Sequence, residues 1–136
     1  MKKIFLLAAC ILTLSFYSFG QQTQADTTLV IQFDSMVHDY GTILKGSDGS
    51  CEFVFKNSGK TPLILNNVQA SCGCTVPEWT REPVQPGKSG VIKVKYNTQI
   101  VSTFNKSITV TSNAKNSPVI LSIKGVVTEP PAAEVK

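Results

Sequence analysis

Apolar residues alternate with polar ones through most of the chain, and this period of two restricts the fold more than any other feature. In the segment SCEFVFKN, the side chains of Cys51, Phe53 and Phe55 point to one face of a strand, and the intervening residues point to the other. VIKVKYN, KSITVTSN and VILSIKGVV, further along the chain, alternate in the same way. Each segment is therefore expected to form a strand with one dry face and one wet face.

Turn residues separate these segments, and no window shows a convincing 3.6-residue apolar stripe. The expected strands are Leu29–Phe33, Cys51–Lys56, Leu63–Ala70, Val91–Tyr96, Ser107–Thr111 and Val119–Val127. Short strands with turns every 8–12 residues are typical of sandwiches, whereas a closed barrel is the alternative. We predict an all-β fold, an immunoglobulin-like antiparallel β-sandwich of about seven strands.

The N-terminus has the pattern of a secretory signal peptide. Lys2 and Lys3 precede an apolar run from Ile4 to Phe19, which ends in small and polar residues. We expect residues 1–20 to be removed, so that the mature chain begins at Gln21. The alternative is a lipoprotein cleavage box ending at Cys10, but cleavage there would leave an apolar new N-terminus.

The remaining chain is long enough for one domain with one core. We expect a flexible leader at 21–28, the sandwich at 29–128 and a Pro/Ala-rich disordered tail at 129–136, with no membrane span in the mature chain. The signal peptide predicts export to the periplasm or cell envelope.

Charge and residue types exclude several function classes. The formal net charge is +4, but the lysines are scattered and Arg81 is the only arginine, so no basic stripe suited to nucleic acid is present. His38 is the only histidine, and its neighbour Asp39 would point to the opposite face of a strand. The pattern predicts a protein that is not an enzyme and has no cofactor.

Several motifs together resemble a bacterial envelope family called domain of unknown function fifteen seventy-three. They are HDYGTI at 38–43, FVFKNSGKTPLIL at 53–65, SCGCTVPEW at 71–79, PVQPGKSGVIKVKY at 83–96 and ITVTSN at 108–113. That family is similar to the immunoglobulin-like domains of the major sperm protein and Hydin group. The resemblance implies a β-sandwich with a binding or scaffolding role and no enzymatic activity.

Cys51, Cys72 and Cys74 remain in the predicted mature chain, and an exported chain meets an oxidising compartment. If Cys72 and Cys74 continue a strand, they share a face with Cα atoms about 6.6 Å apart. A bond between them requires the backbone to bend, and Gly73 permits bending. Such a bond would suit thiol exchange, although no cation lies near it in the sequence.

Two other interpretations of the cysteine pair stay open. Two thiolates suit a soft ion such as Cu(I) or Zn²⁺, with Met36 and His38 as the only further soft or imidazole ligands. Alternatively the cysteines are structural, buried where the chain crosses between the sheets, with a bridge from Cys51 to Cys72 or Cys74 as a variant. We favour the structural interpretation.

The sequence therefore predicts an exported, non-catalytic binding or scaffolding module of the bacterial envelope, whose partner is an unidentified envelope protein or glycan. The alternative is a soft-metal or thiol-redox site at Cys72 and Cys74.

Overall fold

A computed structural model of the protein describes residues 29–132. The predicted signal peptide at 1–20, Cys10, the leader at 21–28 and the last four residues of the predicted tail lie outside the described residues.

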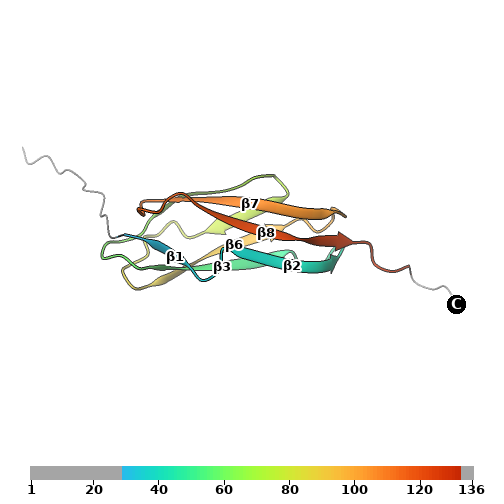
Figure 1. Ribbon diagram of the computed structural model, residues 1–136, viewed down its shortest axis with the longest axis horizontal. Coiled ribbons are helices and arrows are strands. Elements are labelled where there is room, and N and C mark those ends of the chain that lie inside the picture. The colour runs from blue at the N-terminus through green and yellow to red at the C-terminus, as the bar shows by residue number, and fades with distance from the viewer. Residues whose placement is uncertain (1–28, 133–136) are drawn as a thin grey trace, which may run out of the picture.

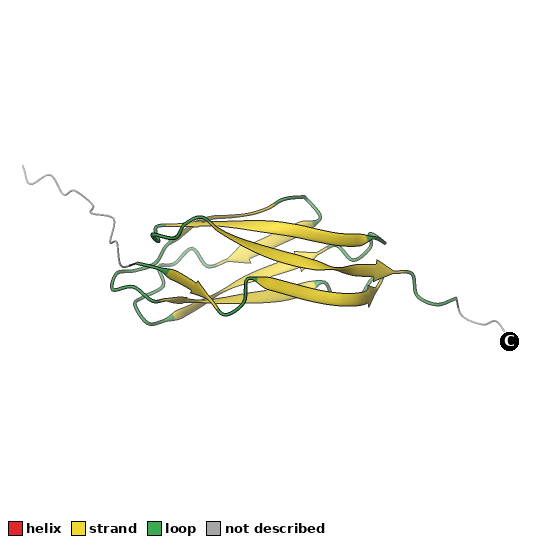
Figure 2. Cartoon of the chain, viewed as in Figure 1, coloured by secondary structure: helices red, strands yellow, loops and turns green. Residues whose placement is uncertain are grey.

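Eight strands and their connecting loops make up the described part of the chain (Figure 2). The strands are β1 (Ile31–Phe33), β2 (Val37–Leu44), β3 (Ser50–Asn57), β4 (Leu65–Ala70), β5 (Thr75–Trp79), β6 (Ser89–Tyr96), β7 (Thr103–Ser112) and β8 (Val119–Thr128). Residues 29–132 include no helix that could cross a membrane.

The strands form two four-stranded sheets, with orders β1-β3-β6-β5 and β2-β8-β7-β4. Figure 1 shows the two sheets stacked in an elongated sandwich, with β1 and β2 following each other along one long side. The sandwich prediction is confirmed.

The alternation of apolar and polar residues explains why the two sheets pack against each other. The inward residues Phe53 and Phe55 of β3, Ile92 of β6 and Leu121 of β8 are almost completely buried between the sheets. Tyr96 of β6 stacks on Phe104 of β7 with ring centroids 3.8 Å apart, which joins the two sheets at the end of β6. Burial of such side chains contributes about 1.5–3 kcal/mol each.

Two strands were missing from the prediction, for local reasons. In β2 the register shifts between Asp39 and Thr42, where Gly41 has a φ of 63°, so the alternation changes phase within the strand. In β5, Pro77 interrupts the run TVPEW, because proline cannot donate to a ladder.

The strands are not all antiparallel, because β2 pairs with β8 in parallel. The N-terminal stretch first pairs antiparallel with β3 as β1, and then changes sheets between Phe33 and Val37. It thereby meets β8 running in the same direction. The other strand pairs are antiparallel, as predicted.

Side chains occupy the free edge of β1 at Ile31 and the free edge of β2 at its first residue, Val37. The Asn116 side-chain amide donates to Ile31 O at 2.9 Å, and its Oδ1 accepts from Ile31 N–H at 3.1 Å, so one residue replaces a partner strand. Ser35 acts similarly at β2, since its Oγ donates to Val37 O at 2.8 Å and accepts from Val37 N–H at 3.3 Å. Such devices prevent further strands from pairing.

The remaining two edges, β5 and β4, lie on the other side of the sandwich. Asn97 N–H donates to Cys74 O at 2.8 Å, so the backbone groups of Cys74 point toward β6. By alternation the backbone groups of Thr75, Pro77 and Trp79 point away from β6, toward the free edge, where Pro77 has no N–H to offer. On β4, Ser71 N–H donates to Ser107 O at 2.9 Å. The same alternation directs the backbone groups of Val68 and Ala70 outward, and no described strand pairs with them.

We predict that Asn57→Ala lowers the free energy of unfolding by about 2–4 kcal/mol, because three backbone groups lose a buried partner. The Asn57 side-chain amide donates to Thr61 O and Val84 O, both at 2.8 Å, and Oδ1 accepts from Gly59 N–H at 2.8 Å. Urea unfolding monitored by Trp79 fluorescence measures the loss. Asn66→Ala, at an exposed position, is the control and should change stability by less than about 0.5 kcal/mol. Equal effects at the two positions would contradict this account.

Candidate functional site

The cysteine pair forms a disulfide in the loop between β4 and β5. Cys72 and Cys74 are bonded to each other, with Cα atoms 5.3 Å apart, which is shorter than the extended spacing. Cys51 is a free, buried cysteine of β3. The bridge from Cys51 to Cys72 or Cys74, considered from the sequence, is therefore absent.

The surroundings of Gly73 differ from the structural interpretation, which required buried thiols and a closely packed glycine. Cys72 and Cys74 are half-buried, and Gly73 is exposed. Apart from its two neighbours, a Cβ added to Gly73 would meet no atom within 4 Å, and the residue is not among the glycines with positive φ. Gly73 therefore makes no close backbone contact, whereas Cys74 packs partly against the core.

A groove of about 630 Å³ lies beside this loop. One wall is the turn from Gly46 to Gly49, a second is Gly73, Cys74 and Val76, and a third is the segment from Lys95 to Gln99. Cys74 lines the groove, whereas Cys72 does not. The groove thus gives access to one side of the disulfide.

Hydrogen bonds between the walls hold the groove open. Thr98 Oγ1 donates to Ser47 O at 2.6 Å, and Tyr96 N–H donates to Gly49 O at 2.9 Å. A side chain at Gly49 would collide with the Tyr96 carbonyl oxygen, so only glycine allows the turn to approach β6. Together with the bond from Asn97 N–H to Cys74 O, these contacts fix three loops from distant parts of the sequence to one another.

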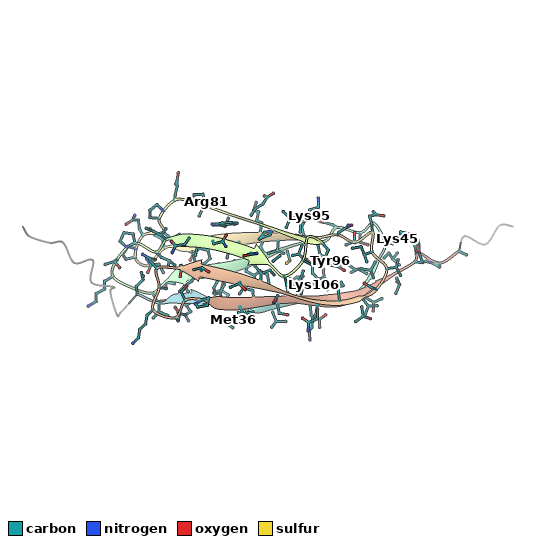
Figure 3. The ribbon with its side chains drawn as sticks, turned by 90° about the horizontal axis from the view of Figure 1, so that it is seen from above. Met36, Lys45, Arg81, Lys95, Tyr96 and Lys106 are labelled. Atoms are coloured by element: carbon teal, nitrogen blue, oxygen red, sulfur yellow. A yellow bond between two sulfur atoms is a disulfide. The ribbon has the colours of Figure 1, made fainter. Side chains whose placement is uncertain are left out.

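The groove carries both charges and an apolar surface. Hydrogen bonds from the side chain and backbone of Ser50 hold the pKa of Asp48 below its usual value, so this carboxylate is ionised at neutral pH. Lys95 lies on the opposite wall, and Figure 3 shows its position. Val76 is 55% exposed and adds an apolar contact next to Cys74.

A lysine on the inner face of β7 stands next to the disulfide loop. Lys106 is half-buried and alternates with the buried Phe104 and Ile108, so it shares their inward face. Ser71 pairs with Ser107 through hydrogen bonds of 2.9 and 3.2 Å, so the β4–β7 register, continued by one residue, brings Cys72 to the level of Lys106. Within residues 29–132 Lys106 takes part in none of the ion pairs.

Sequence reasoning found no cation near the cysteines and missed Lys106. A signal was present, because Lys106 precedes the inward Ile108 by two residues in KSITVTSN. The β4–β7 register, which the sequence does not give, was needed to bring it to Cys72. The same holds for Asp48 and Lys95, whose loops meet Cys74 only in the folded chain.

Cys51 has a chemical environment opposite to that of the disulfide. Burial raises the pKa of the Cys51 thiol, and a hydrogen bond with Tyr40 offsets part of that effect. Burial also raises the pKa of Tyr40, whose hydroxyl donates to Gly49 O at 2.7 Å. Both groups stay protonated, and Cys51 therefore behaves as a small apolar core residue.

The possible metal co-ligands are not near the disulfide. His38 is on β2, and Met36 immediately precedes this strand, which is one edge of its sheet, whereas the Cys72–Cys74 loop follows β4 at the other edge. Three strand spacings of about 4.8 Å separate these edges. Figure 3 likewise shows Met36 and Arg81, which follows β5, on opposite sides of the molecule. In the described part of the chain, no group of three His, Cys, Asp or Glu residues could hold a metal ion.

The family comparison confirms the family that the sequence resembles. The model of a family described as protein of unknown function (DUF1573) matches residues 31–127. No curated protein matches the chain.

Solved structures share the fold at low sequence identity. A protein of unknown function from Porphyromonas gingivalis W83 is 22% identical with a TM-score of 0.63, covering 81% of this chain and 50% of that one. A PapD-like domain of human CEP192 is 8% identical with a TM-score of 0.62, covering 96% and 98%. The secreted serine protease VesC from Vibrio cholerae is 15% identical with a TM-score of 0.57, covering 75% and 24%.

These likenesses show the fold alone, and they confirm the immunoglobulin-like sandwich. This chain spans half of the Porphyromonas gingivalis protein and about a quarter of the protease.

We predict that Cys51 does not react with iodoacetamide in the folded protein at neutral pH, and that it reacts fully in urea. Mass spectrometry of the alkylated protein checks this. The raised pKa also predicts a pH dependence: the unfolded thiol has a pKa near 9.0, and the folded one a higher value. The stabilisation is thus present below about pH 9 and is lost as the pH rises through the folded pKa. An unfolding free energy that increased above about pH 9 would contradict the assignment.

We predict that the double substitution Cys72→Ser with Cys74→Ser lowers the free energy of unfolding by only about 1.6 kcal/mol, because the bond closes a loop of three residues in the chain-entropy model. Chemical denaturation of both proteins measures the difference. A loss above about 3 kcal/mol, the value expected for a loop of about 15 residues, would show that the bond supports the whole sandwich.

Proposed function

We propose that this chain, which belongs to the DUF1573 family of proteins of unknown function, is an exported, non-catalytic binding module of the bacterial envelope. It binds an extended segment of a partner protein along the edge of β4.

The open edge of β4 is the observation that carries this proposal. Asn116 closes β1, Ser35 closes part of β2, and Pro77 interrupts the edge of β5. The outward backbone groups of Val68 and Ala70 have no such protection in the described chain. An extended peptide can therefore hydrogen-bond to them as an added strand.

The chemistry of this edge favours a protein over a glycan. The N–H and C=O groups of Val68 and Ala70 repeat every second residue, which is the spacing of a polypeptide backbone. Asn66, Asn67 and Gln69 expose polar side chains beside the edge. The partner segment would thus have polar side chains on its outer face.

Alternative docking faces are less well supported. Val54 and Val91 are paired on the outer face of one sheet and are half-buried, whereas Ile120 and Val126 belong to the other sheet. Apolar residues divided between opposite faces do not make one docking surface.

The arrangement around the only histidine supports a non-catalytic role. His38 packs edge-on against Tyr40 with ring centroids 4.5 Å apart. The Asp39 carboxylate instead accepts from Gly41 N–H at 2.8 Å and lies 3.4 Å from Lys124 Nζ. This histidine therefore lacks the orienting carboxylate that a general base requires. The predicted signal peptide at 1–20 supports export.

Affinity capture from envelope extracts tests the proposal with two matched variants. Ala70→Pro removes the outward N–H without removing a bond to β7, whereas Ala70→Ser keeps that N–H. We expect wild type and Ala70→Ser to retain the same protein, and Ala70→Pro to bind it at least about tenfold more weakly. Circular dichroism verifies that all three proteins are folded.

The outcomes distinguish a wrong binding site, a wrong class of partner and a wrong function. A partner held equally by Ala70→Pro would show that binding occurs elsewhere than at β4. Retention of a glycan alone would contradict the protein partner, and retention of nothing by wild type would contradict the binding role.

A further inference from the structure

We propose that the Cys72–Cys74 disulfide is a thiol–disulfide exchange site for a dithiol substrate, with the sulfur of Cys74 as the atom attacked. This inference goes beyond the binding function and does not depend on the β4 edge.

Access to the sulfur atoms is the first argument. A buried structural disulfide is protected by packing, but here both cysteines are only half-buried and Gly73 between them is exposed. Apart from its two neighbours Cys72 and Cys74, no described residue lies within 4 Å of the space that a Gly73 side chain would occupy. Cys74 lines the groove of about 630 Å³.

The second argument is that the loop stays in place without the sulfur bond. Asn97 N–H holds Cys74 O at 2.8 Å, Ser71 N–H binds Ser107 O at 2.9 Å, and Thr75 N–H reaches Cys72 O at 3.4 Å. These bonds anchor the backbone on both sides of the disulfide. Reduction therefore leaves the two thiols close together, as reversible exchange requires.

The third argument concerns the leaving group. Attack at Cys74 releases Cys72 as a thiolate, and a nearby cation or hydroxyl stabilises a thiolate. By the register Lys106 is level with Cys72, and described acidic groups form no ion pair with it, so this lysine distinguishes Cys72 as the leaving sulfur. Thr75 Oγ1 lies 3.8 Å from Cys72 Sγ and 3.9 Å from Cys74 Sγ, so this hydroxyl is near both sulfurs.

The reaction balances as an exchange of two electrons. A substrate thiolate attacks Cys74 Sγ, the Cys72–Cys74 bond breaks, and Cys72 leaves as a thiolate that takes up a proton. The second thiol of the substrate loses its proton and attacks the substrate sulfur that is bonded to Cys74 in the mixed disulfide. Cys74 leaves as a thiolate, which is then protonated. The substrate dithiol becomes a disulfide, and the protein disulfide becomes two thiols.

Titration with dithiothreitol buffers tests whether exchange occurs in the folded protein. Alkylation of quenched samples and mass spectrometry give the fraction of reduced protein, while circular dichroism follows the fold. We expect reversible reduction of Cys72 and Cys74 with the sandwich intact and Cys51 unmodified. A disulfide that stays oxidised until the protein unfolds would overturn the proposal.

Two lysine variants test the stabilisation of the leaving thiolate. Lys106→Gln should slow reduction by about tenfold, since a leaving thiol of higher pKa departs more slowly. Lys56→Gln, at an exposed lysine of β3 outside the groove, is the control and should change the rate less than about twofold. Urea midpoints exclude a change in stability as the cause. Equal rates in the two variants would overturn the role of Lys106.

Acid-quenched reaction of the oxidised protein with reduced glutathione tests the direction of attack. Fragment spectra should place the glutathione adduct on Cys74, and an adduct on Cys72 would overturn the assignment. The capture experiment and the dithiothreitol titration of the wild type have separate readouts, so the proposed binding edge and the exchange site can fail separately.

Discussion

Burial of one face of each sheet against the other is the constraint from which the rest of the structure follows. It fixes which residues of β3, β6, β7 and β8 point inward, and so it also fixes which ones must face solvent. The stacked rings of Tyr96 and Phe104 join the two sheets at the end of β6, and the turn at Gly49 packs on β6 at the same place. The groove beside Cys74 is therefore built against the packed core, because Tyr96 lines it.

The two proposed activities occupy neighbouring parts of one side of the molecule. The β4 edge ends at Ala70, and the disulfide loop begins directly after it. The hydrogen bond from Ser71 N–H to Ser107 O comes directly after β4, and the register that it continues brings Cys72 to the level of Lys106. The Ser71–Ser107 hydrogen bond thus positions both the end of the β4 edge and the disulfide loop. The groups that would act are different: backbone N–H and C=O groups at the edge, and sulfur atoms in the loop.

Most of the fold could be predicted from the sequence, because alternation is a local signal. Phe53 and Phe55 face inward as expected, and both are fully buried or nearly so. The alternating pattern did not reveal β2, because Gly41 changes which residues face inward partway along the strand. It did not reveal β5, because Pro77 has no backbone N–H to donate. The change of sheet between β1 and β2, which produces the parallel pair, has no local pattern at all.

The candidate site was less predictable, because it depends on register and on contacts between distant loops. The sequence identified the cysteine pair and the bend that its bond requires. It did not distinguish a Cys72–Cys74 bond from a bridge to Cys51, since both geometries agree with the spacing. Asp48, Lys95 and Lys106 surround the loop only through tertiary structure, and the register between Ser71 and Ser107 has no counterpart in composition.

The distribution of closed and open edges also limits how copies of this protein can associate. Continuous cross-molecule sheets need two unprotected edges on each molecule, one to receive a neighbour and one to offer to the next. Asn116 and Pro77 obstruct β1 and β5, whereas Ser35 occupies only the first residue of β2. Edge-to-edge growth is therefore confined to the sheet that has β4 and β2 at its edges.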